Sequence, residues 1–253
     1  MTRARGRETP TNPFDYGSAI APSALVDRVD EVMRLSRAGA RRERIFFIGP
    51  RRYGKTSILR AVEQRLTAEG LVVLRHDAEK YESLDVLAQA LITGAARALT
   101  GRLDLAQRAL GRFFATLKPE ATFHAVDQTL SVTLGVRGSA ETSRMPLLTD
   151  ALDGINALAK SARRKVVVIL DELQQVVVDG GVTAERQLRS VVQTHEHVGC
   201  IFAGSKTRLL IDMTQDHSRA FYKLGARLFL GPIPRDDFRA FLSRSFAAAG
   251  VAT

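Results

Sequence analysis

The stretch that most constrains this chain is residues 45–59, which read IFFIGPRRYGKTSIL. Residues 45–48 form a short apolar run of β-forming residues, typical of a buried parallel strand. Residues 49–56 then match the pattern G-x-x-x-x-G-K-[ST] at every fixed position. Apolar residues recur at helical spacing over 57–66. A strand, a glycine loop and a helix therefore follow one another in the order that a phosphate-binding loop (P-loop) requires.

The residue types of this loop suit the binding of a triphosphate. Gly49 and Gly54 allow a tight turn that brings backbone N–H groups against phosphate oxygens, and the helix start adds the positive end of its dipole. Lys55 would reach the β- and γ-phosphates, and the Thr56 hydroxyl would bind Mg²⁺. The alternative is a chance glycine loop before a helix, which the fitting strand and helix on either side disfavour. The expected nucleotide-binding residues are Gly49, Pro50, Arg51, Arg52, Tyr53, Gly54, Lys55, Thr56 and Ser57.

A second stretch, residues 165–172, carries the other half of the expected chemistry. An apolar run without alternation ends in Asp171 and Glu172, which predicts a strand buried on both faces. Asp171 would lie at the carboxyl end of that strand, at the same sheet edge as the P-loop. There it would hold Mg²⁺ through water, as a Walker B aspartate does, and Glu172 would polarise the attacking water. A pair of solvated loop carboxylates is the alternative interpretation, which the P-loop makes less attractive.

The rest of the chain alternates strands and helices, as expected for an α/β domain. Further strands are predicted at 71–77, 199–206 and 227–230, with two short strands within 122–136. Helices are predicted at 23–38, 83–99, 102–117, 147–161, 207–213 and 236–249, a polar loop at 137–144, and residues 191–197 would finish another helix. Ser205 lies at the polar end of the strand at 199–206, where a γ-phosphate sensor would be.

The charge balance bears on the partner. Lys plus Arg number 37 against 27 acidic residues, a net charge of +10, which favours DNA, RNA or another polyanion as a partner. A second interpretation stays open, because arginine is common throughout the chain. Part of the excess lies in the N-terminal tail and in the pairs Arg41–Arg42 and Arg51–Arg52, and the second pair would simply face phosphate.

Composition also bounds the compartment. No apolar run approaches the roughly 20 residues of a membrane span, and the N-terminus lacks the apolar core of a secretory signal. The single cysteine, Cys200, lies in an apolar stretch and is expected to be a core residue. None of the five histidines has cysteine or carboxylate partners at zinc spacing, so no transition metal is expected. A cytoplasmic protein with no membrane partner fits these observations best.

Four stretches, GPRRYGKTS, VVVILDELQQ, IFAGSKTRLL and AFYKLGARLFLGPIPRDDF, occur in one order over about residues 12–246. This order resembles archaeal-type P-loop ATPases of the AAA/STAND group. The resemblance implies ATP and Mg²⁺ as cofactors, a three-layer αβα sandwich with a parallel sheet ordered 5-1-4-3-2, and hydrolysis by a water that Glu172 positions. It also assigns Ser205 to the sensor position, residues 25–31 to the surroundings of the base, and the strands within 122–136 to a family insertion.

The same resemblance leaves three arginines open as a second sensor or an arginine finger, acting within the chain or on a neighbour. They are Arg208, Arg219 and Arg227, and each could equally be a surface salt-bridge residue. The expected organisation is a flexible basic tail at 1–13, a P-loop ATPase core at 14–231, and the start of a helical lid domain at 232–253. Only the first lid helix is expected, so either the chain is truncated or its output comes from another protein.

Three functions compete. The first is a Mg²⁺-dependent ATPase that drives conformational change or assembly on nucleic acid, such as loading or remodelling. The second is a slowly hydrolysing, nucleotide-dependent signalling switch that forms a homo-oligomer and acts through a partner protein. The third is a nucleotide-binding scaffold without turnover, which the carboxylate pair Asp171–Glu172 disfavours.

Overall fold

The structure is a computed structural model that describes residue 14, residue 21 and residues 25–100, 120–124, 129–133 and 146–250. The expected tail at 1–13, the helix at 102–117 and the loop at 137–144 lie outside these residues. In the part of the chain that the structure describes, no helix combines the length and apolarity needed to cross a bilayer.

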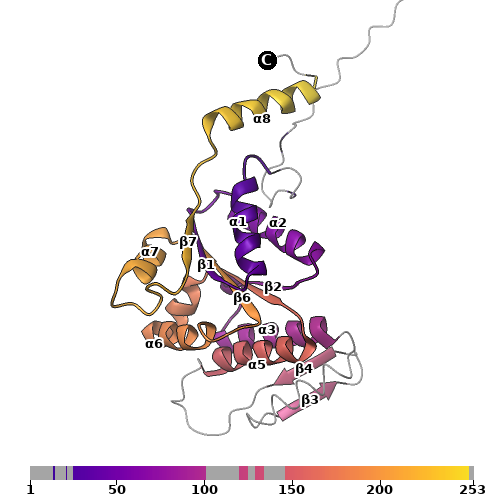
Figure 1. Cartoon of the computed structure of the whole chain (residues 1–253), viewed down its shortest axis with the longest axis vertical. Helices are drawn as coiled ribbons and strands as arrows, with labels where there is room; N and C mark the ends of the chain where they lie inside the picture. Colours follow the sequence, from indigo (N-terminus) through magenta and orange to yellow (C-terminus); the bar gives the residue numbers. More distant parts are fainter. Residues whose placement is uncertain are drawn as a thin grey trace, which may run out of the picture.

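A parallel sheet of five strands forms the centre of the molecule (Figure 1). Its strands are β1 (Arg44–Ile48), β2 (Val72–Asp77), β5 (Val166–Asp171), β6 (Val198–Gly204) and β7 (Ala226–Phe229). Their spatial order is β2-β5-β6-β1-β7. Numbered along the chain and read from the β7 edge, this order is 5-1-4-3-2, which confirms the prediction. The β-branched and aromatic residues of β1, β5 and β6 are buried on both faces, whereas β7 at the edge of the sheet is mostly exposed.

Helices cover both faces of the sheet, α1 and α2 on one and α3, α5 and α6 on the other (Figure 1). Their bounds are α1 (Val29–Ala40), α2 (Lys55–Ala68), α3 (Leu84–Thr100), α5 (Pro146–Ala162), α6 (Gln174–Val192) and α7 (Thr207–Gln215). Alternate strand residues face the two layers. In β5, Val166, Val168 and Leu170 pack on the α3–α5–α6 side, whereas Val167 and Ile169 pack on the α1–α2 side. The architecture is the predicted three-layer αβα sandwich.

The strand register aligns the carboxyl ends of the strands at one edge. Ile48 at the end of β1 pairs with Gly204 at the end of β6, and Asp77 at the end of β2 pairs with Asp171 at the end of β5. The loop that follows β1 and Ser205, which follows β6, therefore meet at the edge where the two aspartates lie. In open α/β sheets, this is the edge where ligands bind.

The expected core cysteine and the expected strand pair are both present. Cys200 is fully buried in β6, and burial raises the pKa of its thiol to about 12. The second sheet consists of β3 (Glu120–His124) and β4 (Thr129–Thr133), which pair in antiparallel fashion. The first of these strands begins at Glu120, earlier than the alternation over 122–136 predicted, and residues 125–128 and 134–136 lie outside the described residues.

Helix α1 begins at Val29, not at residue 23 as the apolar spacing predicted. Asp27 has a φ of 45°, a left-handed conformation that an α-helix does not contain. The buried Arg28 side chain forms an ion pair with Glu31 at 2.9 Å and donates to the Gly231 carbonyl at 2.8 Å. These contacts fix the residues before α1 against the segment that follows β7.

Helix α6 ends at Val192, so the prediction that residues 191–197 finish a helix is wrong. The Arg44 guanidinium from β1 donates to the carbonyls of Val192 and His195, at 2.8 and 2.7 Å. The His197 carbonyl already accepts from the backbone N–H of Val166 in β5. Arg44 therefore satisfies the carbonyl of the last helical residue and a carbonyl in the turn after it, and His197 already pairs with β5.

The chain leaves the sheet after Leu230 and forms α8 (Arg235–Ala248), which extends away from the sandwich (Figure 1). None of the α8 residues is buried. The Phe14 ring packs against Phe241 and Phe246 of α8, with ring centroids 5.9 and 5.3 Å apart. Helix α8 occupies the position at which the start of a lid was predicted, and the domain bounds at 231 and 232 stay a prediction.

Candidate nucleotide-binding site

The P-loop connects β1 to α2 at the carboxyl edge of the sheet. Gly54 is the N-cap of α2 and has a φ of 90°, a conformation that favours glycine. A Cβ on Gly49 would lie 2.7 Å from the Leu230 Cβ, so glycine is also required there by close packing. The two fixed glycines of the motif therefore have distinct structural roles, one conformational and one steric. Thr56, the predicted Mg²⁺ ligand, lies at the exposed start of α2.

Lys55 lies inside the loop that it belongs to. Its side chain is 6% exposed, and its Nζ donates to the Pro50 carbonyl at 3.3 Å. Burial lowers the pKa of Lys55, and the carboxylates of Glu172 and Asp171 oppose this effect by favouring the charged form. The ammonium group is thus close enough to the two carboxylates after β5 for their charges to act on it.

Asp171 ends β5 and is buried, with 5% of its surface exposed. Its Oδ1 accepts a hydrogen bond from the backbone N–H of Glu172 at 3.0 Å. Burial raises the pKa of Asp171 to about 6, and the neighbouring carboxylates of Glu172 and Asp77 act in the same direction. Burial and the charges of these two carboxylates thus make ionisation of Asp171 harder, and the Lys55 ammonium partly offsets this effect.

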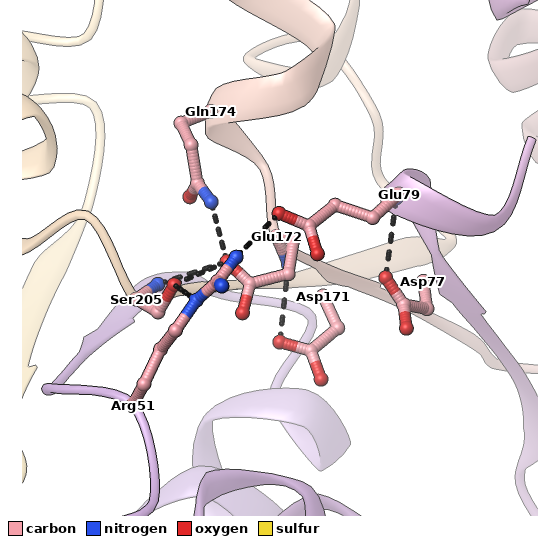
Figure 2. A network of polar contacts seen from close by, with 7 residues as sticks. All are labelled: Arg51, Asp77, Glu79, Asp171, Glu172, Gln174 and Ser205. Atoms are coloured by element: carbon pink, nitrogen blue, oxygen red, sulfur yellow. Dashed lines mark hydrogen bonds and ion pairs between the residues drawn. The ribbon is translucent and has the colours of Figure 1, made fainter.

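Glu172 follows Asp171 in a left-handed conformation, with a φ of 52°. Its Oε2 accepts from the Ser205 backbone N–H at 3.0 Å and from the Ser205 hydroxyl at 2.9 Å. It also accepts from the Gln174 amide, as Figure 2 shows. Burial alone would raise the pKa of Glu172, but the hydrogen bonds from Gln174 and Ser205 outweigh burial and lower it. These bonds therefore keep the carboxylate ionised and hold it in one position.

Arg51 of the P-loop lies across this network (Figure 2). Its Nη2 forms an ion pair with Glu79 Oε1 at 3.0 Å, and its Nε donates to the Ser205 hydroxyl at 3.4 Å. The Glu79 backbone N–H in turn donates to Asp77 Oδ1 at 3.1 Å. Arg51 thereby connects the P-loop to the ends of both β2 and β6. Its neighbours Arg52 and Tyr53 are exposed.

The structure brings the predicted residues Lys55, Asp171, Glu172 and Ser205 together, and it adds residues that the sequence interpretation missed. These are Asp77, Glu79 and Gln174. Asp77 had a signal in the sequence, because it ends a predicted strand just as Asp171 does. Gln174 and Glu79 had none, because their partners are set by the path of the backbone after each strand.

The three candidate arginines lie apart from this network. Arg219 donates through Nε and Nη2 to Glu185 Oε2, at 3.0 and 2.5 Å, and Glu185 is fully buried. Arg227 donates to the Thr214 carbonyl at 3.2 Å. Arg208 is exposed on α7. Within the chain, Arg219 is therefore a partner of a buried carboxylate; a role for any of the three as sensor or finger stays a prediction, as does the place of residues 25–31 near the base.

The fold is similar to several solved structures. A Walker-type ATPase of Pyrococcus abyssi gives a TM-score of 0.59 at 18% identity, covering 96% of this chain and 64% of that chain. The Orc1 protein of Aeropyrum pernix in complex with DNA gives 0.53 at 16% identity, covering 88% and 50%. The Orc2 protein of the same organism in its ADP form gives 0.52 at 18% identity, covering 92% and 55%. The chain spans less than two thirds of each of these proteins, and likeness at such identities shows the fold.

The family follows from the sequence itself. A search of curated proteins found no match. A family model described as an AAA domain matches residues 40–210, a range that includes the P-loop, Asp171, Glu172 and Ser205. Since this range is more than half of the chain, the protein belongs to the AAA domain family of P-loop ATPases, as the resemblance implied.

Proposed function

We propose that the protein binds ATP with Mg²⁺ and hydrolyses it, with Glu172 as the residue that activates water. The observation that carries this proposal is the contact between Glu172 and Ser205 beside the P-loop lysine. It brings a candidate general base, a candidate γ-phosphate sensor and a phosphate-binding cation to one sheet edge. These are the positioned charges and donors that phosphoryl transfer to water needs.

The residues present fit a Mg²⁺ ion. The Thr56 hydroxyl is an oxygen ligand of the kind that Mg²⁺ prefers, and the Asp171 carboxylate would hold the ion through water. Burial raises the pKa of Asp171 to about 6, and a divalent cation would favour its ionised form. Thr56 and Asp171 would hold the ion, which would supply positive charge to offset the negative charge that develops during transfer.

The chain's own residues would then act in sequence. Lys55 would exchange the Pro50 carbonyl, which it contacts at 3.3 Å, for phosphate oxygens. The Ser205 hydroxyl would turn from Glu172 to the γ-phosphate. Glu172 would take a proton from the water whose oxygen attacks the γ-phosphorus. The bond between that phosphorus and the β–γ bridging oxygen would break, giving ADP and inorganic phosphate.

What the hydrolysis drives is a further part of the proposal. The net charge of +10 supports an ATPase that drives assembly or conformational change on nucleic acid, and one protein of similar fold was solved in complex with DNA. The alternative is a slowly hydrolysing signalling switch that assembles with copies of itself or with a partner protein. A cytoplasmic location stays a prediction from the sequence.

The two alternatives differ in their response to nucleic acid. Steady-state phosphate release would be measured with and without Mg²⁺, and with single- or double-stranded DNA at low and moderate salt. Stimulation by DNA that falls steeply with salt would support the nucleic-acid ATPase, because binding through phosphates releases counterions. Slow turnover without stimulation, together with ATP-dependent assembly in solution, would support the switch. No Mg²⁺-dependent hydrolysis under any of these conditions would contradict the proposed activity itself.

A further inference from the structure

Gln174 is a polar side chain in an unusual environment. It begins α6 and is fully buried. Its Nε2 donates to Glu172 Oε2, and among the described residues its Oε1 has no hydrogen-bond partner. A buried acceptor without a partner lowers stability, and an apolar side chain of similar size would avoid this penalty. The amide is therefore poorly explained as a packing element.

The absence of a side chain at Gly204 leaves room for the Gln174 amide. A Cβ on Gly204 would lie 2.2 Å from Gln174 Oε1 and 2.6 Å from Leu210 Cδ1. Any residue other than glycine at the end of β6 would thus displace the glutamine side chain or α7. Glycine at this position and glutamine at the start of α6 together hold the amide N–H against the carboxylate of Glu172.

The hydrogen bonds of Glu172 are divided unequally between its two oxygens. Oε2 accepts from the Ser205 N–H, the Ser205 hydroxyl and Gln174, whereas the described part of the chain offers Oε1 no hydrogen bond. If the Ser205 hydroxyl turns to the γ-phosphate, Oε2 keeps two donors, one from the residue after β6 and one from α6. Two donors from different elements would fix the carboxylate, while a single donor would leave it free to turn.

We propose that Gln174 is the positioning residue of Glu172, holding Oε2 so that Oε1 faces the water and takes its proton. This inference rests on the proposed function, because it concerns how Glu172 is held during hydrolysis. In this role, Gln174 itself touches neither substrate nor water. Its contribution is the orientation of the base when the Ser205 hydroxyl contacts the nucleotide.

The test is the substitution Gln174→Met, which keeps the side-chain length and removes the donor. We expect the maximal turnover rate to fall about 10- to 100-fold, the order of loss that a misplaced catalytic group causes. The affinity for ATP should stay within about twofold, since the P-loop is untouched. The matched control is Gln175→Met, because Gln175 is the next residue and donates to the exposed Asp179 at 2.9 Å, away from Glu172. The control should keep the turnover of the parent protein.

A second comparison separates positioning from a general structural role. Gln174→Met would be combined with Glu172→Gln, and single-turnover rates would be measured. If Gln174 acts through Glu172, the double variant should be no slower than Glu172→Gln alone. An equal further loss in that background would overturn the inference. Unchanged or faster turnover in Gln174→Met alone would also overturn it, and faster turnover would mean that the amide restrains Glu172.

Two further measurements distinguish failure of the Gln174 inference from failure of the proposed function and from loss of folding. If Glu172→Gln itself retains full turnover, the proposed function fails, independently of Gln174. If Gln174→Met melts well below the parent protein, Gln174→Asn replaces it, because asparagine keeps an amide that is one methylene too short to reach Glu172. Full turnover in Gln174→Asn would then overturn the inference. A fall in its turnover of about 10-fold or more would support it.

Discussion

Ser205 donates two hydrogen bonds to a single oxygen of Glu172, one from its backbone N–H at 3.0 Å and one from its hydroxyl at 2.9 Å. The two residues directly follow different strands, β5 and β6, and are 33 positions apart in the chain. Glu172, the candidate base, and Ser205, the candidate sensor, are therefore hydrogen-bonded to each other. Any ligand that takes the Ser205 hydroxyl must therefore change the hydrogen bonding of Glu172.

Substitution of Ser205 by alanine should separate catalysis from binding. The variant loses one donor to Glu172 and the proposed donor to the γ-phosphate. We expect turnover to fall roughly 10²-fold, in the range seen when one donor to a developing charge is removed. ATP affinity, measured by titration with a fluorescent analogue, should change little. Ser190→Ala is the control, because its hydroxyl donates to the Gln187 carbonyl on an exposed part of α6. Equal turnover in Ser205→Ala and Ser190→Ala would remove Ser205 from the mechanism.

Substitution of Lys55 by alanine should abolish triphosphate binding. The Lys55 side chain is buried inside the P-loop, where its ammonium group contacts the Pro50 carbonyl. Its removal would take away the positive charge closest to a bound phosphate. Equilibrium titration with ATP in the presence of Mg²⁺ checks this. Lys165→Ala removes an exposed lysine just before β5, and it should bind ATP as the parent does. ATP affinity in Lys55→Ala equal to that of the control would contradict the assignment of the loop.

Asp171 should destabilise the protein in the absence of metal and nucleotide. Its folded-state pKa of about 6 lies above the ordinary value of 3.8, so the folded state binds the proton more tightly than the unfolded state. The free energy of unfolding should therefore fall as pH rises from about 4 to 6, and the penalty is fully present above pH 6. Asp171→Asn removes this charge and keeps an acceptor for the Glu172 N–H.

At pH 8 in EDTA, we expect Asp171→Asn to be more stable than the parent by about 1–3 kcal/mol, the span that this pKa shift allows. Urea unfolding at pH 8 and at pH 4 measures the difference, which should nearly vanish at pH 4. The same variant should lose Mg²⁺-dependent turnover. A parent protein that is the more stable at pH 8 would show that the Asp171 carboxylate is satisfied without a cation.

Arg219 should be needed for folding stability. Its guanidinium is the partner of Glu185, which is fully buried and also accepts from the Phe221 backbone N–H at 3.3 Å. Arg219→Ala leaves that carboxylate buried without its cation, which costs on the order of 3–5 kcal/mol. The combined change Glu185→Leu and Arg219→Leu should recover much of this loss. Wild-type stability with lost turnover in Arg219→Ala would instead favour a finger role.

The sequence alone predicted the P-loop and the carboxylates of the site, because the patterns that indicate them are local in the chain. The P-loop pattern and the valine-rich run before Asp171 each lie within one strand and its following loop, and parallel strands bring their carboxyl ends to one edge. The sheet order came from the family resemblance. By contrast, the Arg51–Glu79 ion pair and the Gln174–Glu172 contact depend on side-chain directions after strands end, which no spacing encodes.

The ends of helices α1 and α6 also depend on contacts that the sequence pattern does not encode. Apolar periodicity over 23–38 continues through Asp27, but a left-handed residue there delays α1 until Val29. The sequence predicted that the helix continues through the histidines after Val192. Arg44, far away in the sequence, instead donates hydrogen bonds to the carbonyls of Val192 and His195. Periodicity reports which residues are buried, and tertiary hydrogen bonds decide where the helix begins and ends.

The central claim is that Glu172 activates water for ATP hydrolysis, and the rate of phosphate release from Glu172→Gln tests it most directly. Saturating ATP and Mg²⁺ would be used, and ATP binding would be confirmed by titration. Glutamine keeps the size of the side chain but cannot take a proton, so binding should persist while turnover falls by on the order of 10²–10⁴. Turnover equal to that of the parent protein, with ATP bound, would contradict the account.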